Sequence, residues 1–435
     1  MPRETILFSR NTWKAFLISA LVVASVAEFS ARGPCRFLLT GTNWNDFLSP
    51  YIQARAWTRG HDPYAVGSLL SMWPADNPRY RFVDDDAKSG ILEKTRGIPS
   101  PYPLTTLVVV APLTLLSWSV AIRLWFLVNL IGVLAAPFAL LSICDYSALA
   151  PRGLLFLGTA FALAPWQTGL ATANPALLAV SLTVAAVWAE RRSSQWTAGT
   201  LLSLALCLKP TVAGGLLLYY FARRKWKVAF IASAVTAAVG AVGVCRLAMS
   251  GTPWLSSYLE NSRRIFAPGS LDDFSRANPL RFDLINAQVP LYAIFKSTSA
   301  ANATALLVGA MMIACWIWFC YFDRPTNDLL EISGLSVVSL IPVYHRFYDA
   351  ALLIWPLALS LLSTKRSSAT VLIFATIVPF LAPGATLLDQ GSPFLRTGWL
   401  WDVIIMPHQA WDLLLLAIFL LYYKARDYRE AQLGV

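Results

Sequence analysis

The feature that most constrains this chain is a series of long apolar runs. Residues 121–143 read AIRLWFLVNLIGVLAAPFALLSI and carry a single charge, at Arg123. A helix of about 20 apolar residues is long enough to cross the hydrocarbon core of a bilayer. Lipid offers no hydrogen-bond partners, so a spanning backbone must satisfy its own polar groups. The runs therefore predict an all-α polytopic membrane protein.

Composition supports this class and excludes others. Apolar residues make up 57% of the chain and charged residues only 14%, whereas a soluble domain has roughly 25% charged residues. The net charge of +11 does not indicate nucleic-acid binding, because the basic residues form short clusters at the ends of apolar runs. The six cysteines show no CxxC and no Cys/His spacing, so neither a disulfide framework nor a zinc site is expected.

The Lys and Arg clusters orient the apolar runs, because short cytoplasmic loops are enriched in these residues. Arg3, Arg10 and Lys14 precede or begin the first run, and KARDYR at residues 424–429 follows the last. Both ends are therefore predicted to lie inside. With every other basic cluster also placed inside, the chain is predicted to cross the membrane about twelve times. The predicted spans are 13–30, 121–143, 152–166, 174–190, 196–209, 211–222, 227–248, 301–322, 328–343, 349–363, 368–383 and 400–423.

Residues 99–118, PSPYPLTTLVVVAPLTLLSW, are the one apolar run left out of this count. If they crossed the membrane, every inner basic cluster up to Lys227 would face outside. The run is short, and Pro101, Pro103 and Pro112 interrupt it. We therefore expect a re-entrant or surface-lying segment on the outer side.

The long connections then all lie outside, at 31–120 and 249–300, whereas the inner loops are short. We expect these two outer segments to form the active-site side of a single domain covering residues 1–435. The first run also resembles a signal peptide, but the loop-like sequence after it favours an uncleaved helix.

Asp46 is the first candidate for chemistry. The sequence FLSPYIQARAW after it has apolar residues at helical spacing, Ser49 and Pro50 suit a helix start, and Gly60 suits a stop. This pattern predicts an amphipathic helix lying on the outer membrane face. Asp46 is then either a helix-start acid satisfied by backbone amides or a general base beside the membrane.

Two basic segments at the outer ends of helices suggest anion binding. His345 and Arg346, next to Tyr348, could hold an anionic headgroup or phosphate, or could be interfacial residues with a snorkelling arginine. Lys209 is surrounded by apolar residues and is costly there unless it is paired or near water. Either an anionic partner or snorkelling of the Lys209 ammonium toward water would remove this cost.

Two further clusters are weaker candidates. The carboxylates at 84–86 could bind a divalent cation, although such a run is more often a solvated loop. Arg263 and Arg264, in the second outer segment, could contact phosphate or simply be solvated.

Four stretches together resemble a known family. They are NDFLSPYIQARAWTRGHDPY at 45–64, SPYPLTTLVVVAPLTLL at 100–116, LALCLKPTVAGGLLLYYFARRKW at 204–226 and LIPVYHRFYDAALLIWPL at 340–357. Their order and spacing resemble glycosyltransferase family 87 (GT87) of the GT-C superfamily, over about residues 40–360. A mycobacterial α-1,2-mannosyltransferase of phosphatidylinositol mannosides is one member. The chain departs from the family's Gly-Gln-x-Asn pattern, since Ala173 precedes Asn174 and Gln167 is displaced.

The resemblance implies a GT-C-like fold with outer-face juxtamembrane helices in a bacterial plasma membrane. It implies an inverting transfer of a sugar, with mannose favoured, from a polyprenyl-phosphate donor to a lipid-linked or glycan hydroxyl at the periplasmic face. Asp46 would be the base. No cofactor is required, although a divalent metal would be compatible, and membrane lipids rather than nucleic acid are the expected surroundings. The expected substrate-binding residues are Lys209, His345, Arg346, Tyr348, Trp44, Tyr64, Tyr102, Asn174 and Arg264.

Two other classes of function stay open from the residues alone. A transporter or flippase for a lipid-linked sugar would show charges in mid-helix and related halves, whereas here the charges gather at outer helix ends. A non-enzymatic membrane scaffold is the third alternative.

Overall fold

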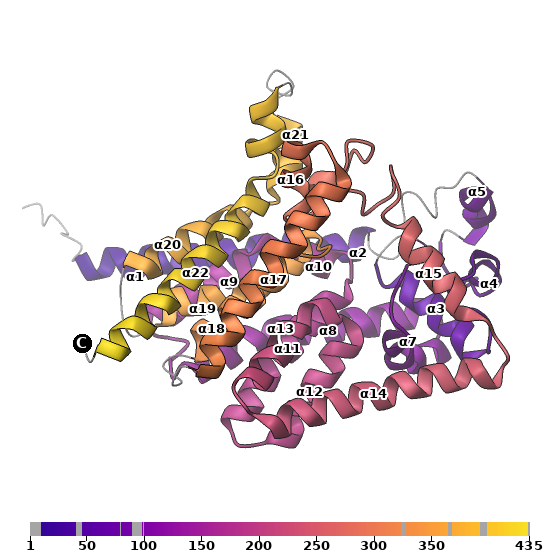
Figure 1. Cartoon of the computed structure of the whole chain (residues 1–435), viewed down its shortest axis with the longest axis horizontal. Coiled ribbons are helices and arrows are strands. Elements are labelled where there is room, and N and C mark those ends of the chain that lie inside the picture. The colour runs from indigo at the N-terminus through magenta and orange to yellow at the C-terminus, as the bar shows by residue number, and fades with distance from the viewer. Residues whose placement is uncertain are drawn as a thin grey trace, which may run out of the picture.

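The computed structural model describes residues 10–40, 46–78, 80–88, 98, 100–322, 328–363, 368–391 and 398–433. These residues form helices and connecting loops with no β-strand, and their single isolated bridge joins Leu284 and Arg346. The predicted all-α class is confirmed (Figure 1).

The first half of the chain contains α1 (Arg10–Ser30), η1 (Ala31–Cys35), α2 (Arg36–Thr40), α3 (Leu48–Thr58), α4 (Val66–Ser71), η2 (Tyr80–Phe82), α5 (Val83–Lys88), α7 (Leu104–Val110), η3 (Ala111–Leu115), α8 (Trp118–Ile143), α9 (Pro151–Ala162), α10 (Ala164–Ala171), α11 (Pro175–Arg191), α12 (Gln195–Leu208) and α13 (Pro210–Ala222). The second half contains α14 (Trp226–Met249), α15 (Trp254–Arg264), η4 (Arg281–Asp283), α16 (Gln288–Phe295), α17 (Thr298–Phe322), α18 (Asp328–Ser339), η5 (Phe347–Leu353), α19 (Ile354–Leu362), α20 (Ser368–Ile377), η6 (Val378–Leu381), α21 (Gly384–Gly391), η7 (Trp401–Ile405) and α22 (His408–Leu433).

Among the described residues, 4 helices are long and apolar enough to cross a membrane, or up to 5 if a bent pair counts as one span. The four are Trp13–Leu39, Trp118–Ile143, Trp226–Met249 and Thr298–Phe322, and the pair, Pro151–Ala162 with Ala164–Ala171, is bent by 47°. This supports a polytopic membrane protein. The other predicted spans correspond largely to shorter helices, so the count of twelve stays a prediction.

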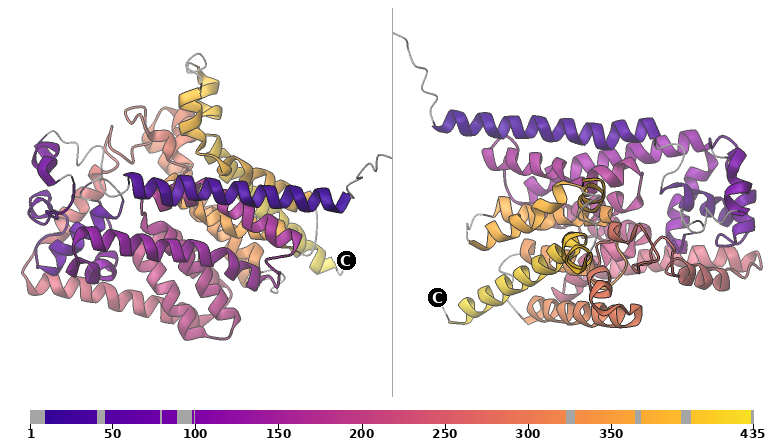
Figure 2. Two further views of the ribbon diagram at one scale, coloured as in Figure 1. Left: turned by 180° about the vertical axis from the view of Figure 1, so that it is seen from behind. Right: turned by 90° about the horizontal axis from the view of Figure 1, so that it is seen from above.

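The first helix is longer than the sequence predicted. It was expected to end at residue 30, but η1 and α2 continue it to Thr40. Pro34 lies inside the π-helical η1, where the wider turn accommodates a residue that cannot donate a backbone hydrogen bond. Residues 31–40 therefore belong to the first helix, and α1 runs along the edge of the molecule against α9 (Figure 2).

Helix α3 is not the amphipathic surface helix that the sequence predicted. Its polar as well as its apolar side chains are buried, including Tyr51, Ile52 and Gln53. The Gln53 amide donates to the Ser100 carbonyl at 2.6 Å, and the Tyr51 hydroxyl donates to the Leu116 carbonyl at 2.9 Å. The prediction was wrong because α7 and η3 cover the face that was expected to meet lipid.

The predicted stop of α3 is confirmed at Gly60. The helix ends at Thr58, and Gly60 adopts a φ of +75°, a conformation that glycine takes at no steric cost. Its carbonyl accepts a hydrogen bond from the Thr252 hydroxyl at 2.7 Å. The chain that follows α3 is therefore fastened to the loop after α14.

Residues 104–115 form α7 and η3, which are shorter than any helix counted as a candidate span. They pack against α3, α12 and α14. The Thr106 hydroxyl donates to the Cys207 carbonyl at 2.7 Å. With α3, α4, α5 and α15, this segment gathers at one end of the molecule (Figure 1).

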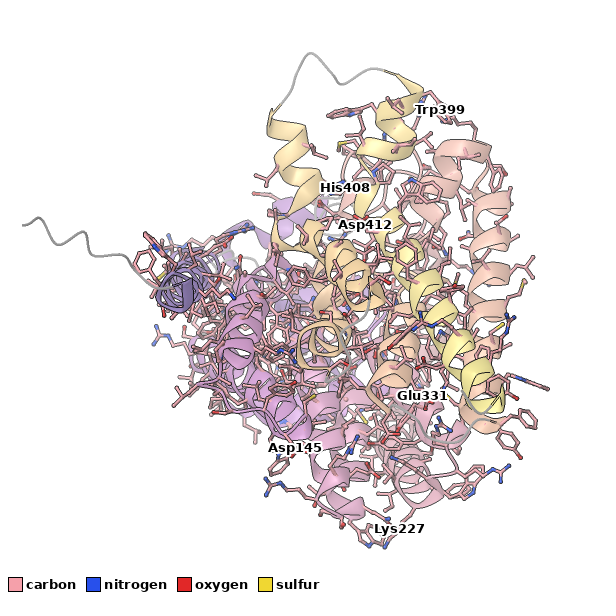
Figure 3. The ribbon with its side chains drawn as sticks, turned by 90° about the vertical axis from the view of Figure 1, so that its left-hand side faces the viewer. Asp145, Lys227, Glu331, Trp399, His408 and Asp412 are labelled. Atoms are coloured by element: carbon pink, nitrogen blue, oxygen red, sulfur yellow. The ribbon has the colours of Figure 1, made fainter. Side chains whose placement is uncertain are left out.

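Several basic residues that the sequence placed inside gather in a cluster of ion pairs away from that end. Glu331 is fully buried there, as is Lys424. In Figure 3, Glu331 and Lys227 lie in the lower half of the molecule, and Trp399 and His408 lie in the upper half. The pairs are Arg223–Glu331, Lys424–Glu331, Arg191–Asp328, Lys225–Asp328 and Lys225–Glu190.

Labelling of introduced cysteines tests the predicted sidedness. In a variant without the native cysteines, an impermeant maleimide should label Ser256→Cys on α15 from outside. It should label Ser194→Cys, between α11 and α12, only after the membrane is opened. This expectation follows from the prediction that residues 99–118 do not cross the membrane, which would keep the loop at Ser194 inside. Labelling of Ser194→Cys in intact cells would contradict this topology.

Candidate active site

A cavity of about 290 Å³ collects charged residues from segments far apart in the chain. It lies where the C-terminal end of the first helix meets α10, η4, η5 and α21. Three arginines and two aspartates line it among aromatic and small side chains. The lining residues are Arg32, Arg36, Asp46, Thr168, Thr172, Phe282, Asp283, Arg346, Phe347, Tyr348, Pro383, Ala385 and Gln409.

Asp46 is held at the cavity by the turn between α10 and α11. Its backbone amide donates to the Thr172 carbonyl at 2.8 Å, and its Oδ2 accepts from Asn174 Nδ2 at 2.8 Å. The next residue, Phe47, is fully buried and stacks on Trp125 with a centroid distance of 4.5 Å. These contacts fix one carboxylate oxygen against Asn174 and leave the other without a hydrogen-bond donor among the described residues.

The turn that presents Asn174 is itself unusual. Ala173 has a φ of +53°, which is uncommon for a residue with a Cβ. Its carbonyl accepts from Trp125 Nε1 at 2.9 Å, and Asn174 Oδ1 caps α11 by accepting from the Ala176 amide at 2.8 Å. Backbone strain of this kind persists only where surrounding contacts impose it and is common at functional sites.

Arg346 reaches the same cavity from the segment before η5. Its Nε donates to the Tyr344 hydroxyl at 2.8 Å, and its Nη2 donates to the Leu271 carbonyl at 3.0 Å and to Asp272 Oδ1 at 3.3 Å. Its side chain is 17% exposed, while that of Asp272 is 2% exposed. Burial raises the pKa of the Asp272 carboxyl to about 6, although the Arg346 guanidinium opposes the shift.

The Asp349 carboxylate does not line the cavity itself and contacts three neighbouring groups. Its Oδ1 accepts from Lys209 Nζ at 2.5 Å, and its Oδ2 lies 3.0 Å from His345 Nδ1 and 3.2 Å from the Arg346 amide. The other His345 nitrogen lies 3.1 Å from the Ser339 carbonyl, and the ring is fully buried. Lys209 and His345 therefore meet a protein carboxylate, and His345 has no surface in the cavity.

The remaining predicted site residues divide into two groups. Tyr348 lines the cavity, with Lys209 Nζ 4.8 Å from its ring centroid. Burial raises the pKa of the Tyr102 phenol, and the negative charges of Asp46, Asp349 and Asp272 raise it further.

The structure does not bring Tyr64 or Arg264 to the cavity wall. Tyr64 is buried, and its hydroxyl donates a hydrogen bond to the Tyr102 carbonyl at 2.7 Å. It therefore holds the Tyr102 backbone in place. Arg264 is exposed on α15 and pairs with Glu260 at 2.9 Å. Trp44 lies outside the described residues.

Sequence reasoning missed five charged residues of this region: Arg32, Arg36, Asp272, Asp283 and Asp349. Arg32 and Arg36 are four residues apart, a spacing that places two side chains on one helix face. This spacing has that meaning only in a helix, and the sequence predicts residues 31–120 as an outer segment. Asp349 lies four residues after His345 inside a stretch that was singled out, so its spacing to His345 could have identified it.

The described residues contain no group of three or more His, Cys, Asp or Glu side chains placed to hold a metal ion. Of the carboxylates at 84–86, only the Asp85 side chain is among the described residues, and it is exposed.

Anion binding in the cavity is expected to weaken below about pH 6, because protonation of Asp272 removes its ion pair with Arg346. Above its pKa the carboxylate is ionised and fixes the guanidinium at the cavity. The Kd for an anionic ligand of the cavity should rise roughly tenfold from pH 7 to pH 5, about the effect of one charge-assisted contact. Asp272→Asn should show a nearly flat Kd across this range, close to the parent's value at low pH. An equally steep rise in Asp272→Asn would contradict the assignment.

Residues 101–343, more than half of the chain, match the model of glycosyltransferase family 87. No curated protein and no solved structure matches the chain.

Proposed function

The chain belongs to glycosyltransferase family 87, and we propose that it moves a sugar from a polyprenyl-phosphate donor to a hydroxyl of a lipid or glycan acceptor. The observation that carries this proposal is the composition of the cavity. One wall holds a carboxylate whose position is fixed by Asn174, and the same cavity is lined by the guanidinium groups of Arg32, Arg36 and Arg346. A glycosyl phosphate needs both kinds of group, one for the attacking hydroxyl and one for the leaving phosphate.

Arginines suit the leaving group because the guanidinium forms paired, charge-assisted hydrogen bonds with phosphate oxygens. Arg346 is held by Asp272, Tyr344 and Leu271, so it needs little rearrangement when charge develops on the departing phosphate. Arg32 also pairs with Glu28 at 2.6 Å. We therefore assign the main phosphate contact to Arg346, with Arg32 and Arg36 adding positive potential.

Asp46 is proposed as the general base. Asn174 holds Oδ2, so Oδ1 can accept the proton of an acceptor hydroxyl that attacks the anomeric carbon. The new glycosidic bond forms as the bond to the phosphate breaks, and the polyprenyl phosphate leaves as an anion. A single displacement of this kind inverts the anomeric centre. Lys209 and His345 act through Asp349, which orients the segment that carries Arg346 and Tyr348.

The setting of the reaction follows from the apolar helices and from family membership. The candidate spans support a membrane protein, and a lipid-borne donor could reach a cavity formed at the end of the first helix. We propose a GT-C-like arrangement with about twelve crossings in a bacterial plasma membrane, the cavity facing the periplasm. Mannose is the proposed sugar, on the resemblance of the sequence motifs alone.

A transfer assay with defined donors tests the proposal. Purified protein in liposomes would receive radiolabelled mannosyl polyprenyl phosphate or the matching nucleotide sugar, together with a bacterial membrane lipid extract. We expect a labelled glycolipid from the lipid donor and none from the nucleotide sugar. Arg346→Gln should raise the KM for the lipid donor roughly ten- to hundred-fold. Transfer from the nucleotide sugar alone, or none from a panel of polyprenyl-phosphate sugars, would refute the proposal.

A further inference from the structure

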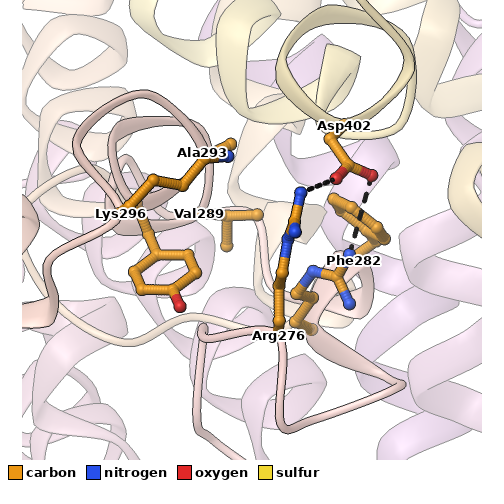
Figure 4. A pocket seen from close by; sticks show the side chains of 8 residues that line it. Arg276, Phe282, Val289, Ala293, Lys296 and Asp402 are labelled. Atoms are coloured by element: carbon orange, nitrogen blue, oxygen red, sulfur yellow. Dashed lines mark hydrogen bonds and ion pairs between the residues drawn. The ribbon is translucent and has the colours of Figure 1, made fainter. Parts of the chain in front are cut away.

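A second, smaller pocket lies beside the main cavity and is strongly basic (Figure 4). It is lined by Arg276, Arg281 and Lys296 and by a single carboxylate, Asp402. Phe282 belongs to the walls of both pockets. Phe282 also packs against the small buried cluster of Ala385, Trp401 and Met406, so this wall is built into the fold.

One carboxylate does not balance the three cations. Asp402 Oδ2 accepts from Arg276 Nη2 at 2.8 Å, and its Oδ1 lies 3.8 Å from Arg281 Nη2. Both oxygens are therefore engaged. Lys296 is exposed and forms no ion pair with any carboxylate of the described residues. The pocket keeps a net positive charge and has at least one ammonium free to bind an anion.

The size of the pocket limits what it can hold. Its volume is about 10 Å³, close to that of a single water. A sugar ring does not fit, whereas one or two oxygens of a phosphate do. The guanidinium carbon of Arg281 lies 4.2 Å from the Phe282 ring centroid, so a cation of this pocket lies against the residue that lines both pockets. A ligand held here by a phosphate can extend across Phe282 into the main cavity.

We propose that this pocket, defined by Arg276, Arg281 and Lys296, binds the phosphate group of an anionic acceptor lipid. This rests on the proposed function. The donor phosphate is assigned to the arginines of the main cavity, so a second cationic pocket next to it serves a second anionic group. The acceptor hydroxyl would lie in the main cavity near Asp46, and its phosphate would lie on the far side of Phe282. The acceptors of this protein are then lipids with a headgroup phosphate.

A binding experiment tests the inference without requiring sugar transfer. The full chain in a non-ionic detergent, which carries no phosphate, would be given either phosphatidylglycerol or diacylglycerol, which both carry a hydroxyl but differ in the phosphate. Native mass spectrometry would measure the lipid retained. We expect the parent to prefer phosphatidylglycerol roughly tenfold, about the effect of one charge-assisted contact. Arg276→Gln and Lys296→Gln, both at exposed positions, should reduce the preference to about twofold or less, whereas Arg264→Gln on α15 should retain it.

Added inorganic phosphate provides the second arm. If it competes with phosphatidylglycerol in the parent and not in Lys296→Gln, the phosphate group is the part recognised. Binding of inorganic phosphate without any preference for phosphatidylglycerol would overturn the assignment to a lipid. An unchanged preference in both pocket variants would overturn the site. Because the readout is binding, failure of sugar transfer would count against the proposed function and not against this pocket.

Discussion

Asp46→Asn is expected to lower turnover roughly 10²–10⁴-fold, the usual effect of losing a general base. Asparagine keeps the shape of the side chain, and its carbonyl oxygen can still accept from Asn174 Nδ2. The Asp46 amide keeps its bond to the Thr172 carbonyl, and Phe47 keeps its stacking on Trp125. The variant therefore loses proton acceptance with little change in structure, and donor binding should stay within a few-fold of the parent.

The matched control is Asp283→Asn, because Asp283 is the other carboxylate among the described residues that line the cavity. Its turnover should fall less than about tenfold, since the account gives it no proton to accept. Single-turnover transfer from a synthetic polyprenyl-phosphate sugar measures both variants. If Asp46→Asn stayed within a few-fold of the parent while Asp283→Asn collapsed, the base would be Asp283. Asp62 is a poorer alternative, since it accepts from the Tyr64 amide at 2.8 Å and does not line the cavity.

Asp349→Asn is expected to destabilise the protein by roughly 3–5 kcal/mol, the usual cost of removing one partner of a buried ion pair. Asp349 is fully buried, and the Lys209 side chain is only 14% exposed. An asparagine oxygen can still accept from the Lys209 ammonium, but the variant removes the negative charge that balances this largely buried cation. Unfolding of the purified protein in detergent measures the loss.

The double variant Lys209→Met with Asp349→Leu should recover most of this stability, because replacing a buried pair by apolar residues is often neutral. Arg264→Gln, which breaks an exposed pair with Glu260, should cost less than about 1 kcal/mol. If Asp349→Asn behaved like Arg264→Gln, Asp349 would not be the residue that organises this region. Low donor affinity in a stable double variant would show that the pair also serves binding.

The class of fold could be predicted because long apolar runs leave few alternatives. The local structure at the end of the first helix and in α3 could not be predicted. Gly33 and Pro34 indicate a break in a helix, yet the chain continues through a π-helical turn because the segment packs against α10, where Leu170 and Gln167 lie close to Gly33. Helix α3 has the pattern of a surface helix, yet Gln53 and Tyr51 find backbone partners in the segment that covers them. Local sequence does not reveal which neighbour will cover a face.

The candidate site shows the same division. Asp46, Arg346 and Tyr348 could be singled out because polar residues beside apolar runs are conspicuous, and all three line one cavity. The partners of the site residues are distant in sequence. Asn174 is 128 residues from Asp46, and Asp349 is 140 residues from Lys209. The sequence indicated that Lys209 needed an anion, but it could not distinguish a protein carboxylate from a substrate phosphate. That distinction depends on which helix ends meet in space.

The most direct test of the central claim is an experimental structure of the Asp46→Asn protein with a polyprenyl-phosphate sugar bound, since the slow variant should hold its donor intact. The account predicts the phosphate within hydrogen-bonding distance of the Arg346 guanidinium, the sugar in the cavity beside residue 46, and the prenyl chain leaving toward lipid. A donor bound elsewhere, or a phosphate held away from Arg346 with residue 46 remote from the sugar, would contradict it.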